Sequence, residues 1–166
     1  MKFTVTETIA AGRDEVLGAL VDPDYYAELG AAATAVRPPE LLAASESAGT
    51  VHTRVRYAFD GTISGPAALV VDVDKLTWVI ETTYDTARHA GSLVVVPDHY
   101  EGMLRCRGTL TLEATDAGAT VETVTGRLEV KVPLLSGAAE KAIFGGFTRH
   151  FELEAIAMAR FCAAHR

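Results

Sequence analysis

The sequence is poor in cysteine, in basic residues and in long apolar runs, and each shortage excludes a class of protein. Its two cysteines, Cys106 and Cys162, lie far apart and form no CxxC motif, which excludes a zinc ribbon and a dithiol redox site. We expect both to be reduced core residues of a cytoplasmic protein. No stretch approaches the roughly 18 consecutive apolar residues of a membrane helix, and the first residues lack the apolar centre of a signal peptide.

Basic residues are outnumbered by acidic ones, 15 to 22, which gives a net charge of −7. Because nucleic-acid binding requires clustered lysine and arginine, the sequence predicts no nucleic-acid partner. The motifs HExxH, GxGxxG, GxxxxGK[ST] and GxSxG are also missing from the chain. Their absence argues against a zinc-protease site, a nucleotide site and a serine nucleophile elbow, so we expect no metal and no cofactor.

The strongest pattern in the sequence is an amphipathic helix near its end, over residues 136–160. Val132-Pro133 marks the boundary before it, because the residue before proline avoids helical angles, and Ser136 is a suitable N-cap. Apolar residues then recur every three or four positions, as on one face of an α-helix. They are Ile143, Phe147, Phe151, Ala155, Met158 and Cys162.

The residues before this helix alternate between apolar and polar, which indicates half-buried strands. The first strand places Phe3, Val5 and Ile9 on one face, with Glu7 the exception. Two short helices follow, at about residues 13–21 and 23–32, then a weak strand candidate at 40–47 and about six strands joined by short turns. These six segments are 51–59, 67–73, 78–84, 91–96, 104–113 and 124–132. We predict one α+β domain over residues 1–166, an antiparallel sheet of six to seven strands wrapped around the long helix.

This order of elements, together with three local stretches, resembles the SRPBCC superfamily of START, polyketide-cyclase and pollen-allergen-like helix-grip proteins, and most of all an uncharacterised actinobacterial branch. The resemblance implies a curved sheet on a long helix with an apolar cavity between them. Its members include lipid carriers, plant hormone receptors, aromatase/cyclases and pure binding modules, and it assigns no catalytic residue here. The stretches are Glu15-Val16-Leu17 leading to Val21-Asp22-Pro23, Lys75-Leu76-Thr77-Trp78-Val79, and Val130-Lys131-Val132-Pro133-Leu134 leading to Ser136-Gly137 and Glu140-Lys141.

Strand parity and the helix stripe together predict a set of aromatic ligand-binding residues facing the interior. Tyrosine and tryptophan would either need polar partners in a packed core or orient a ligand in a cavity, and both interpretations stay open. The predicted set is Tyr57, Trp78, Tyr84, Phe144, Phe147 and Phe151.

Three further features carry interpretations that the structure can test. Gly145-Gly146 lies inside the predicted helix, where each glycine costs roughly 0.8–1 kcal/mol against alanine; we favour close helix–sheet packing over room for a ligand. His150 and Glu154 form an ordinary i,i+4 helix pair. The arginines at 54, 56, 105 and 107 fall opposite the apolar set, so we expect them on the convex face unless a bulge turns one inward.

Three functional hypotheses remain open. The first is binding of a small hydrophobic ligand, a lipid or a polyketide-like aromatic. The second is a cyclase, dehydratase or hydrolase acting on such a molecule, for which Tyr57, Tyr84, His99 and Arg105 are the only loose acid–base candidates. The third is an interaction module whose cavity is filled by its own side chains. Neither the ligand nor the oligomeric state can be read from the sequence.

Overall fold

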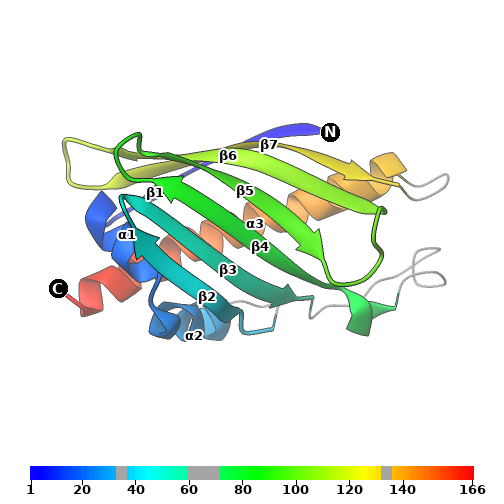
Figure 1. The fold of residues 1–166 in the computed structure, drawn as a ribbon, viewed down its shortest axis with the longest axis horizontal. Helices are drawn as coiled ribbons and strands as arrows, with labels where there is room; N and C mark the ends of the chain where they lie inside the picture. Colours follow the sequence, from blue (N-terminus) through cyan, green and yellow to red (C-terminus); the bar gives the residue numbers. More distant parts are fainter. Residues whose placement is uncertain (33–36, 60–71, 132–135) are drawn as a thin grey trace.

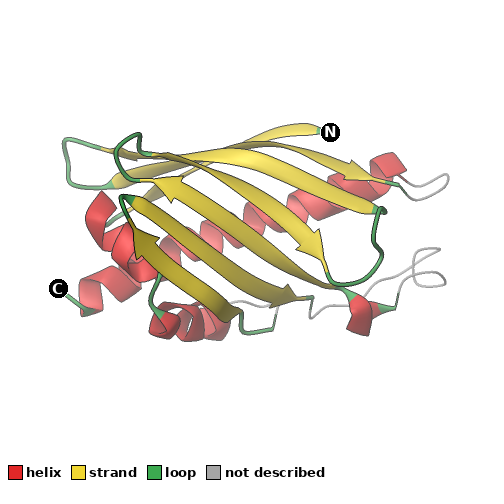
Figure 2. Cartoon of the chain, viewed as in Figure 1, coloured by secondary structure: helices red, strands yellow, loops and turns green. Residues whose placement is uncertain are grey.

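The computed structural model describes residues 1–32, 37–59, 72–131 and 136–166, which form a curved antiparallel sheet and three α-helices (Figures 1 and 2). The strands are β1 (Lys2–Ile9), β2 (Glu40–Ser47), β3 (Thr50–Ala58), β4 (Thr77–Asp85), β5 (Ala90–Pro97), β6 (Leu104–Ala114) and β7 (Thr120–Val130). The helices are α1 (Arg13–Leu20), α2 (Pro23–Ala32) and α3 (Ser136–Ala164), with a 3₁₀ turn, η2 (Val73–Lys75), before β4.

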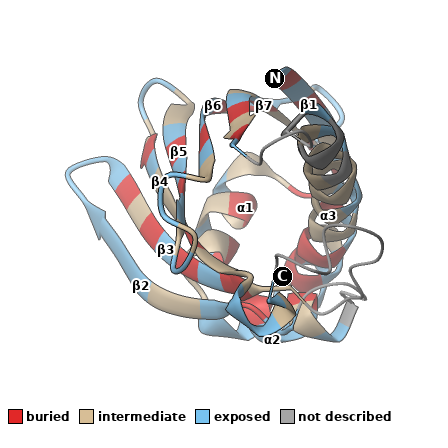
Figure 3. Ribbon diagram, turned by 90° about the vertical axis from the view of Figure 1, so that its right-hand side faces the viewer, coloured by how far each residue is buried: buried red, intermediate tan, exposed pale blue. Residues whose placement is uncertain are grey.

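The seven strands lie in the order β1-β7-β6-β5-β4-β3-β2, and all neighbours are antiparallel. Strands β2 to β7 therefore form a meander, and β1 closes it by pairing with β7. Seen from one end, the strands follow an arc, with α3 across its opening beside β1 and α2 near β2 (Figure 3). This arrangement confirms the predicted helix grip, in which the concave face of the sheet is covered chiefly by α3.

The predicted alternation of apolar and polar residues decides which face of each strand is buried. On β3, Val51, Val55 and Tyr57 are buried, whereas Arg54 and Arg56 are exposed. The two arginines form ion pairs on the convex face, from Arg54 Nε to Glu81 at 2.9 Å and from Arg56 Nε to Asp98 at 3.3 Å. Because the register from β3 to β4 is unbroken, Tyr57 lies directly opposite Trp78 on the concave face.

Two glycines on the concave face permit the tight coiling of the sheet. Gly108 and Gly126 are direct partners on β6 and β7. A Cβ atom at either position would lie 2.7 Å from a backbone carbonyl oxygen of the neighbouring strand. At Gly126 it would also lie 2.7 Å from the Phe3 ring. Side chains at these positions would force the strands apart, so glycine is what lets the sheet curve around α3.

The elements differ from the sequence prediction in a few places. Helix α3 has 29 residues and runs to Ala164, beyond the predicted end at residue 160. Of the predicted strand 67–73, residues 67–71 lie outside the described residues, and Val73 begins the 3₁₀ turn η2. The predicted Val132-Pro133 boundary also lies outside the described residues. Asp22 caps α2, since its Oδ1 accepts the Asp24 N–H at 2.9 Å. No helix among the described residues is long and apolar enough to cross a membrane.

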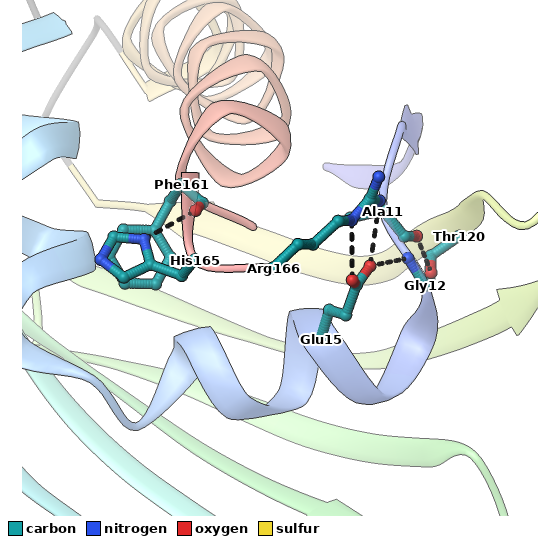
Figure 4. Close-up of polar contacts among 7 residues, drawn as sticks. All are labelled: Ala11, Gly12, Glu15, Thr120, Phe161, His165 and Arg166. Carbon is teal, nitrogen blue, oxygen red and sulfur yellow. Dashed lines mark hydrogen bonds and ion pairs between the residues drawn. The ribbon is translucent and has the colours of Figure 1, made fainter. Parts of the chain in front are cut away.

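The far end of α3 is tied to α1 by charged and polar contacts (Figure 4). Arg166 donates to both carboxylate oxygens of Glu15, at 2.8 and 3.1 Å, and Glu15 accepts the Gly12 N–H at 2.8 Å. Thr120 of β7 donates its buried hydroxyl to the Ala11 carbonyl at 2.8 Å. The Arg166 hydrogen bonds hold the pKa of Glu15 below its ordinary value. Hydrogen bonds and an ion pair therefore connect α1, β7 and the chain end after α3 at this end of the molecule.

Candidate ligand-binding site

The inward face of α3 changes from half-exposed to buried along its length. In its second half Ala155, Met158 and Phe161 are buried. In its first half the inward apolar side chains are packed against the core but stay half-exposed, and so are the sheet residues near this end of α3. The half-exposed residues are Ile143, Phe144, Phe147 and Phe151 on α3, and Trp78, Ile80 and Leu104 on the sheet. Figure 3, viewed from the side where α3 begins, shows the described part of its first turns mostly in tan. The interior is therefore accessible where these apolar walls meet.

Open space also faces Gly146, and this overturns the interpretation of the glycine pair as close packing. Among the residues that the structure describes, a Cβ atom at Gly146 would meet no atom within 4 Å beyond its own helix backbone and chain neighbours. At Gly145 the first contact would be the flexible Arg149 Nη1, at 3.7 Å. Gly146 lies one helical turn before His150, so the two share a face of α3. The packing interpretation was wrong because glycine in a helix can mark unfilled space as well as a close approach.

Tyr57 joins the sheet to α3 beside this space. Its side chain is 4% exposed, and its hydroxyl donates to Glu154 Oε1 at 3.0 Å. The ring stacks on Trp78, with centroids 6.0 Å apart and planes 10° apart. The ring of His150 also contacts the Tyr57 ring, edge to face, with centroids 5.1 Å apart and an angle of 89° between the planes. Burial and the Glu154 charge raise the pKa of Tyr57 well above its ordinary value, so the phenol stays a neutral donor.

His150 and Glu154 form an ion pair that is mostly shielded from water. His150 Nε2 lies 3.2 Å from Glu154 Oε1, and the two side chains are 16% and 21% exposed. Burial disfavours the Glu154 carboxylate, but His150 and the Tyr57 hydroxyl outweigh it, so the pKa of Glu154 is lowered. Burial likewise opposes the charge on His150, yet Glu154 leaves the pKa of His150 raised. The predicted i,i+4 pair is present, but it is an interior pair rather than a solvated one.

Two further carboxyl groups share the concave face with this pair. Glu7 and Glu122 are direct partners on β1 and β7, at positions whose parity matches the buried Val5 and Val124. Burial raises the pKa of Glu122 to about 8, and the charges of Glu154 and Glu7 add to the shift. Glu122 is therefore a neutral acid near pH 7. The sequence signal for this group was Glu7, the one exception in the first strand.

Two polar atoms beside Tyr57 are buried without a partner. Trp78 Nε1 and His150 Nε2 have no hydrogen-bond partner among the described residues. His150 Nε2 is close to Glu154, but its direction is wrong for a hydrogen bond. A donor left unsatisfied in this way costs about 1–3 kcal/mol. The site thus combines apolar walls, open space over Gly146 and unsatisfied donors around one ring.

Comparison with known proteins places this arrangement in a family and a fold. Residues 4–162 match the family described as Protein of unknown function (DUF2505). The chain belongs to the DUF2505 family. No curated protein matches this DUF2505 chain.

Several solved structures share the fold of the DUF2505 chain. They include the ZhuI aromatase/cyclase from Streptomyces sp. R1128, with 17% identity over 98% of this chain and 93% of that one at a TM-score of 0.64. A norcoclaurine synthase point mutant from Thalictrum flavum has 14% identity over 99% of this chain and 95% of that one, at a TM-score of 0.63. A START superfamily protein from Mycobacterium smegmatis has 15% identity over 99% of each chain, at a TM-score of 0.58. These likenesses confirm the predicted helix-grip fold, and membership of the START/SRPBCC superfamily stays a prediction.

The structure of this DUF2505 protein brings together only part of the predicted site. Tyr57 and Trp78 are in contact and lie against α3, where Phe147 and Phe151 occupy the inward face. Phe144 lies toward β1, with its ring 5.8 Å from that of Phe3. These placements leave the ligand-binding role of each residue a prediction.

Three of the other sequence candidates lie elsewhere. Tyr84 is six residues from Trp78 along β4, roughly 20 Å at the usual rise per residue. It is 1% exposed and lies close enough to Arg13 of α1 for the two to interact electrostatically. His99 and Arg105 are exposed, whereas Tyr57 is buried. Of the four loose acid–base candidates, only Tyr57 belongs to the interior cluster.

Two surface hollows of the DUF2505 protein lie away from this interior. One, of about 420 Å³, is an open dish on the sheet between Val94, Arg107 and Arg127. The other, of about 200 Å³, lies between α2 and α3 at Glu28 and Arg160. Neither contains a predicted ligand-binding residue. No group of three metal-ligating side chains occurs among the described residues.

Proposed function

We propose that this protein binds a small hydrophobic molecule between the concave face of the sheet and the first half of α3. The observation that carries the proposal is the half-exposed apolar wall, in which large side chains face the interior and are only partly buried. Ligand pockets are typically apolar with a few convergent polar groups, and Tyr57, Trp78 and His150 supply such groups here. A lipid or a polyketide-like aromatic suits walls of this composition.

The remaining predictions from the sequence belong to the same proposal. We place the protein in the cytoplasm, in an actinobacterial branch of the superfamily, as one domain with no nucleic-acid partner. The net charge of −7 supports the last point. The oligomeric state stays open.

Fluorescence titration with a neutral apolar dye, N-phenyl-1-naphthylamine, tests the proposal. Trp78 is the only tryptophan, so dye bound beside it should quench its emission saturably and gain emission by energy transfer. Replacing Gly146 with leucine should fill the open space and weaken dye binding at least tenfold. Gly18→Leu is the matched control, because Gly18 is an exposed helical glycine whose added Cβ atom would also meet nothing within 4 Å.

The outcomes separate the hypotheses. Saturable binding lost only in Gly146→Leu supports the interior site. Binding unaffected by Gly146→Leu would locate the dye elsewhere, for example in the convex dish, and contradict the proposal. No saturable binding would leave the interaction module as the surviving hypothesis.

An enzyme is a second candidate, and one observation favours it. Glu122 and Glu154 both face the interior, and their environments shift their pKa values in opposite directions, that of Glu122 upward to about 8 and that of Glu154 downward. Such a pair provides a neutral acid and a charged base at the same pH. Two of the structural relatives are also named as enzymes, an aromatase/cyclase and a norcoclaurine synthase. Turnover of a bound compound, lost in Glu122→Gln while binding persists, would distinguish an enzyme from a carrier.

A further inference from the structure

The first observation concerns two hydrogen-bond donors that surround the Tyr57 ring. Trp78 Nε1 always carries a proton, because the indole N–H does not ionise. It is buried and has no hydrogen-bond partner in the described part of the chain. His150 Nε2 lies 3.2 Å from Glu154 Oε1, but the contact does not have the geometry of a hydrogen bond. When Nε2 carries a proton, its N–H is therefore directed away from that oxygen. Both nitrogens therefore retain donor capacity.

The second observation is that the two nitrogens belong to side chains of different elements that contact the same ring. Trp78 lies on β4 and stacks against the face of Tyr57, whereas His150 lies on α3 and meets the same ring edge-on. Gly146 is one turn from His150 and faces open space. An apolar ligand body over Gly146 would thus extend toward the ring that both donors flank.

The third observation concerns charge. Glu154 contributes a full negative charge to this interior, and its oxygen Oε1 already accepts the Tyr57 hydroxyl and pairs with His150. A ligand anion would be repelled by Glu154, and a ligand cation would have to displace His150 from it. Glu7 and Glu122 on the neighbouring strands add no positive charge. The donors therefore suit an acceptor without charge.

We infer that Trp78 and His150 recognise an uncharged oxygen acceptor, such as a ketone, ester or amide carbonyl, on an otherwise apolar ligand. The inference rests on the proposed binding function and specifies the chemistry of its ligand. The carbonyl oxygen accepts from one or both nitrogens beside Tyr57, and the apolar body covers the half-exposed wall of α3.

A matched set of probes tests the inference: 2-acetylnaphthalene, 2-ethylnaphthalene and 2-naphthoate. The first two have nearly the same shape, but only the ketone carries an acceptor. Binding is followed by the indole N–H resonance of Trp78 in a ¹⁵N-labelled sample, which is a single signal because the chain has one tryptophan. We expect the ketone to bind about tenfold tighter than the ethyl compound, the ratio that one net hydrogen bond gives. The ketone should also shift the indole proton downfield.

The variant His150→Phe keeps an aromatic edge against Tyr57 and removes the nitrogen. We expect the ketone-to-ethyl affinity ratio to fall toward one in this variant. If it does not fold, Trp78→Phe, measured by calorimetry, makes the same test on the other donor.

Each result has one meaning. If neither naphthalene binds, the proposed function fails. If both bind with equal affinity, or if 2-naphthoate binds tightest, the pocket exists but the inference is overturned. A ratio that stays high in both His150→Phe and Trp78→Phe would also overturn it.

Discussion

Replacing Gly146 with alanine should stabilise the protein while weakening ligand binding. The added methyl group would meet no atom of the described part of the chain within 4 Å, so we expect no clash to offset the better helix propensity of alanine. Gly146 lies well inside the 29-residue α3, where the difference between glycine and alanine is about 0.8–1 kcal/mol. Part of the gain comes from a less flexible unfolded chain. For a chain of this length, a gain of about 1 kcal/mol raises Tm by roughly 2–4 °C.

The assay compares thermal melts and dye titrations for Gly146→Ala and Gly18→Ala. Gly18 is also helical, exposed and free of contacts within 4 Å, so its alanine variant should gain a similar or smaller amount of stability. Only the methyl at position 146 projects into the proposed ligand space. We therefore expect weaker dye binding in Gly146→Ala and unchanged binding in Gly18→Ala.

A destabilised Gly146→Ala would refute the reasoning, because it would mean that the sheet or a side chain occupies the space next to α3. Equal dye affinity in both variants would keep the stability argument but separate the open space from the ligand site.

Three further experiments test the interior. Between about pH 4.5 and 8 the folded protein holds a proton on Glu122 that the unfolded chain has lost, so stability should fall as pH rises, by up to about 1.4 kcal/mol per pH unit. Denaturant melts of Glu122→Gln should lack this slope; an unchanged slope would contradict the raised pKa. Tyr57→Phe should cost about 1–2 kcal/mol and less in a Glu154→Gln background, whereas equal costs in a double-mutant cycle would mean that the hydroxyl and carboxylate are not coupled. Gly126→Ala should cost about 1–3 kcal/mol through overpacking against Phe3 and the adjacent backbone, and a wild-type melting curve would disprove that contact.

Most of the fold could be predicted because the pattern of each element is local. Alternation along β3 placed Val55 and Tyr57 inward, and the three- and four-residue spacing of α3 identified the inward face of the helix. The strand predicted at 67–73 shows the weakness of short apolar runs, since Val73 begins a 3₁₀ turn instead. A run of that length lacks the repeats that distinguish a strand from a turn.

The site was less predictable because its polar groups come from elements far apart in the sequence. Glu7 broke the alternation of its strand, but its importance depends on Glu122, its partner 115 positions away by the numbering. Pairing of that kind needs the register of β1 with β7, which no local pattern supplies. His150 and Glu154 were predicted to pair, yet a sequence does not tell a solvated helix pair from an interior one. That distinction depends on Tyr57, which reaches Glu154 from β3.

Helix α3 divides stability and binding between its two halves. Its second half is buried against α1 and α2, and the chain end beyond it is held by the pair from Arg166 to Glu15 (Figure 4). Its first half carries half-exposed apolar residues and a glycine over open space, features that lower helix stability by themselves. The buried second half lets the first half keep this open space without unfolding the domain. Substitutions at buried positions such as Met158 should therefore affect melting more than binding, whereas substitutions near Gly146 should affect binding more than melting.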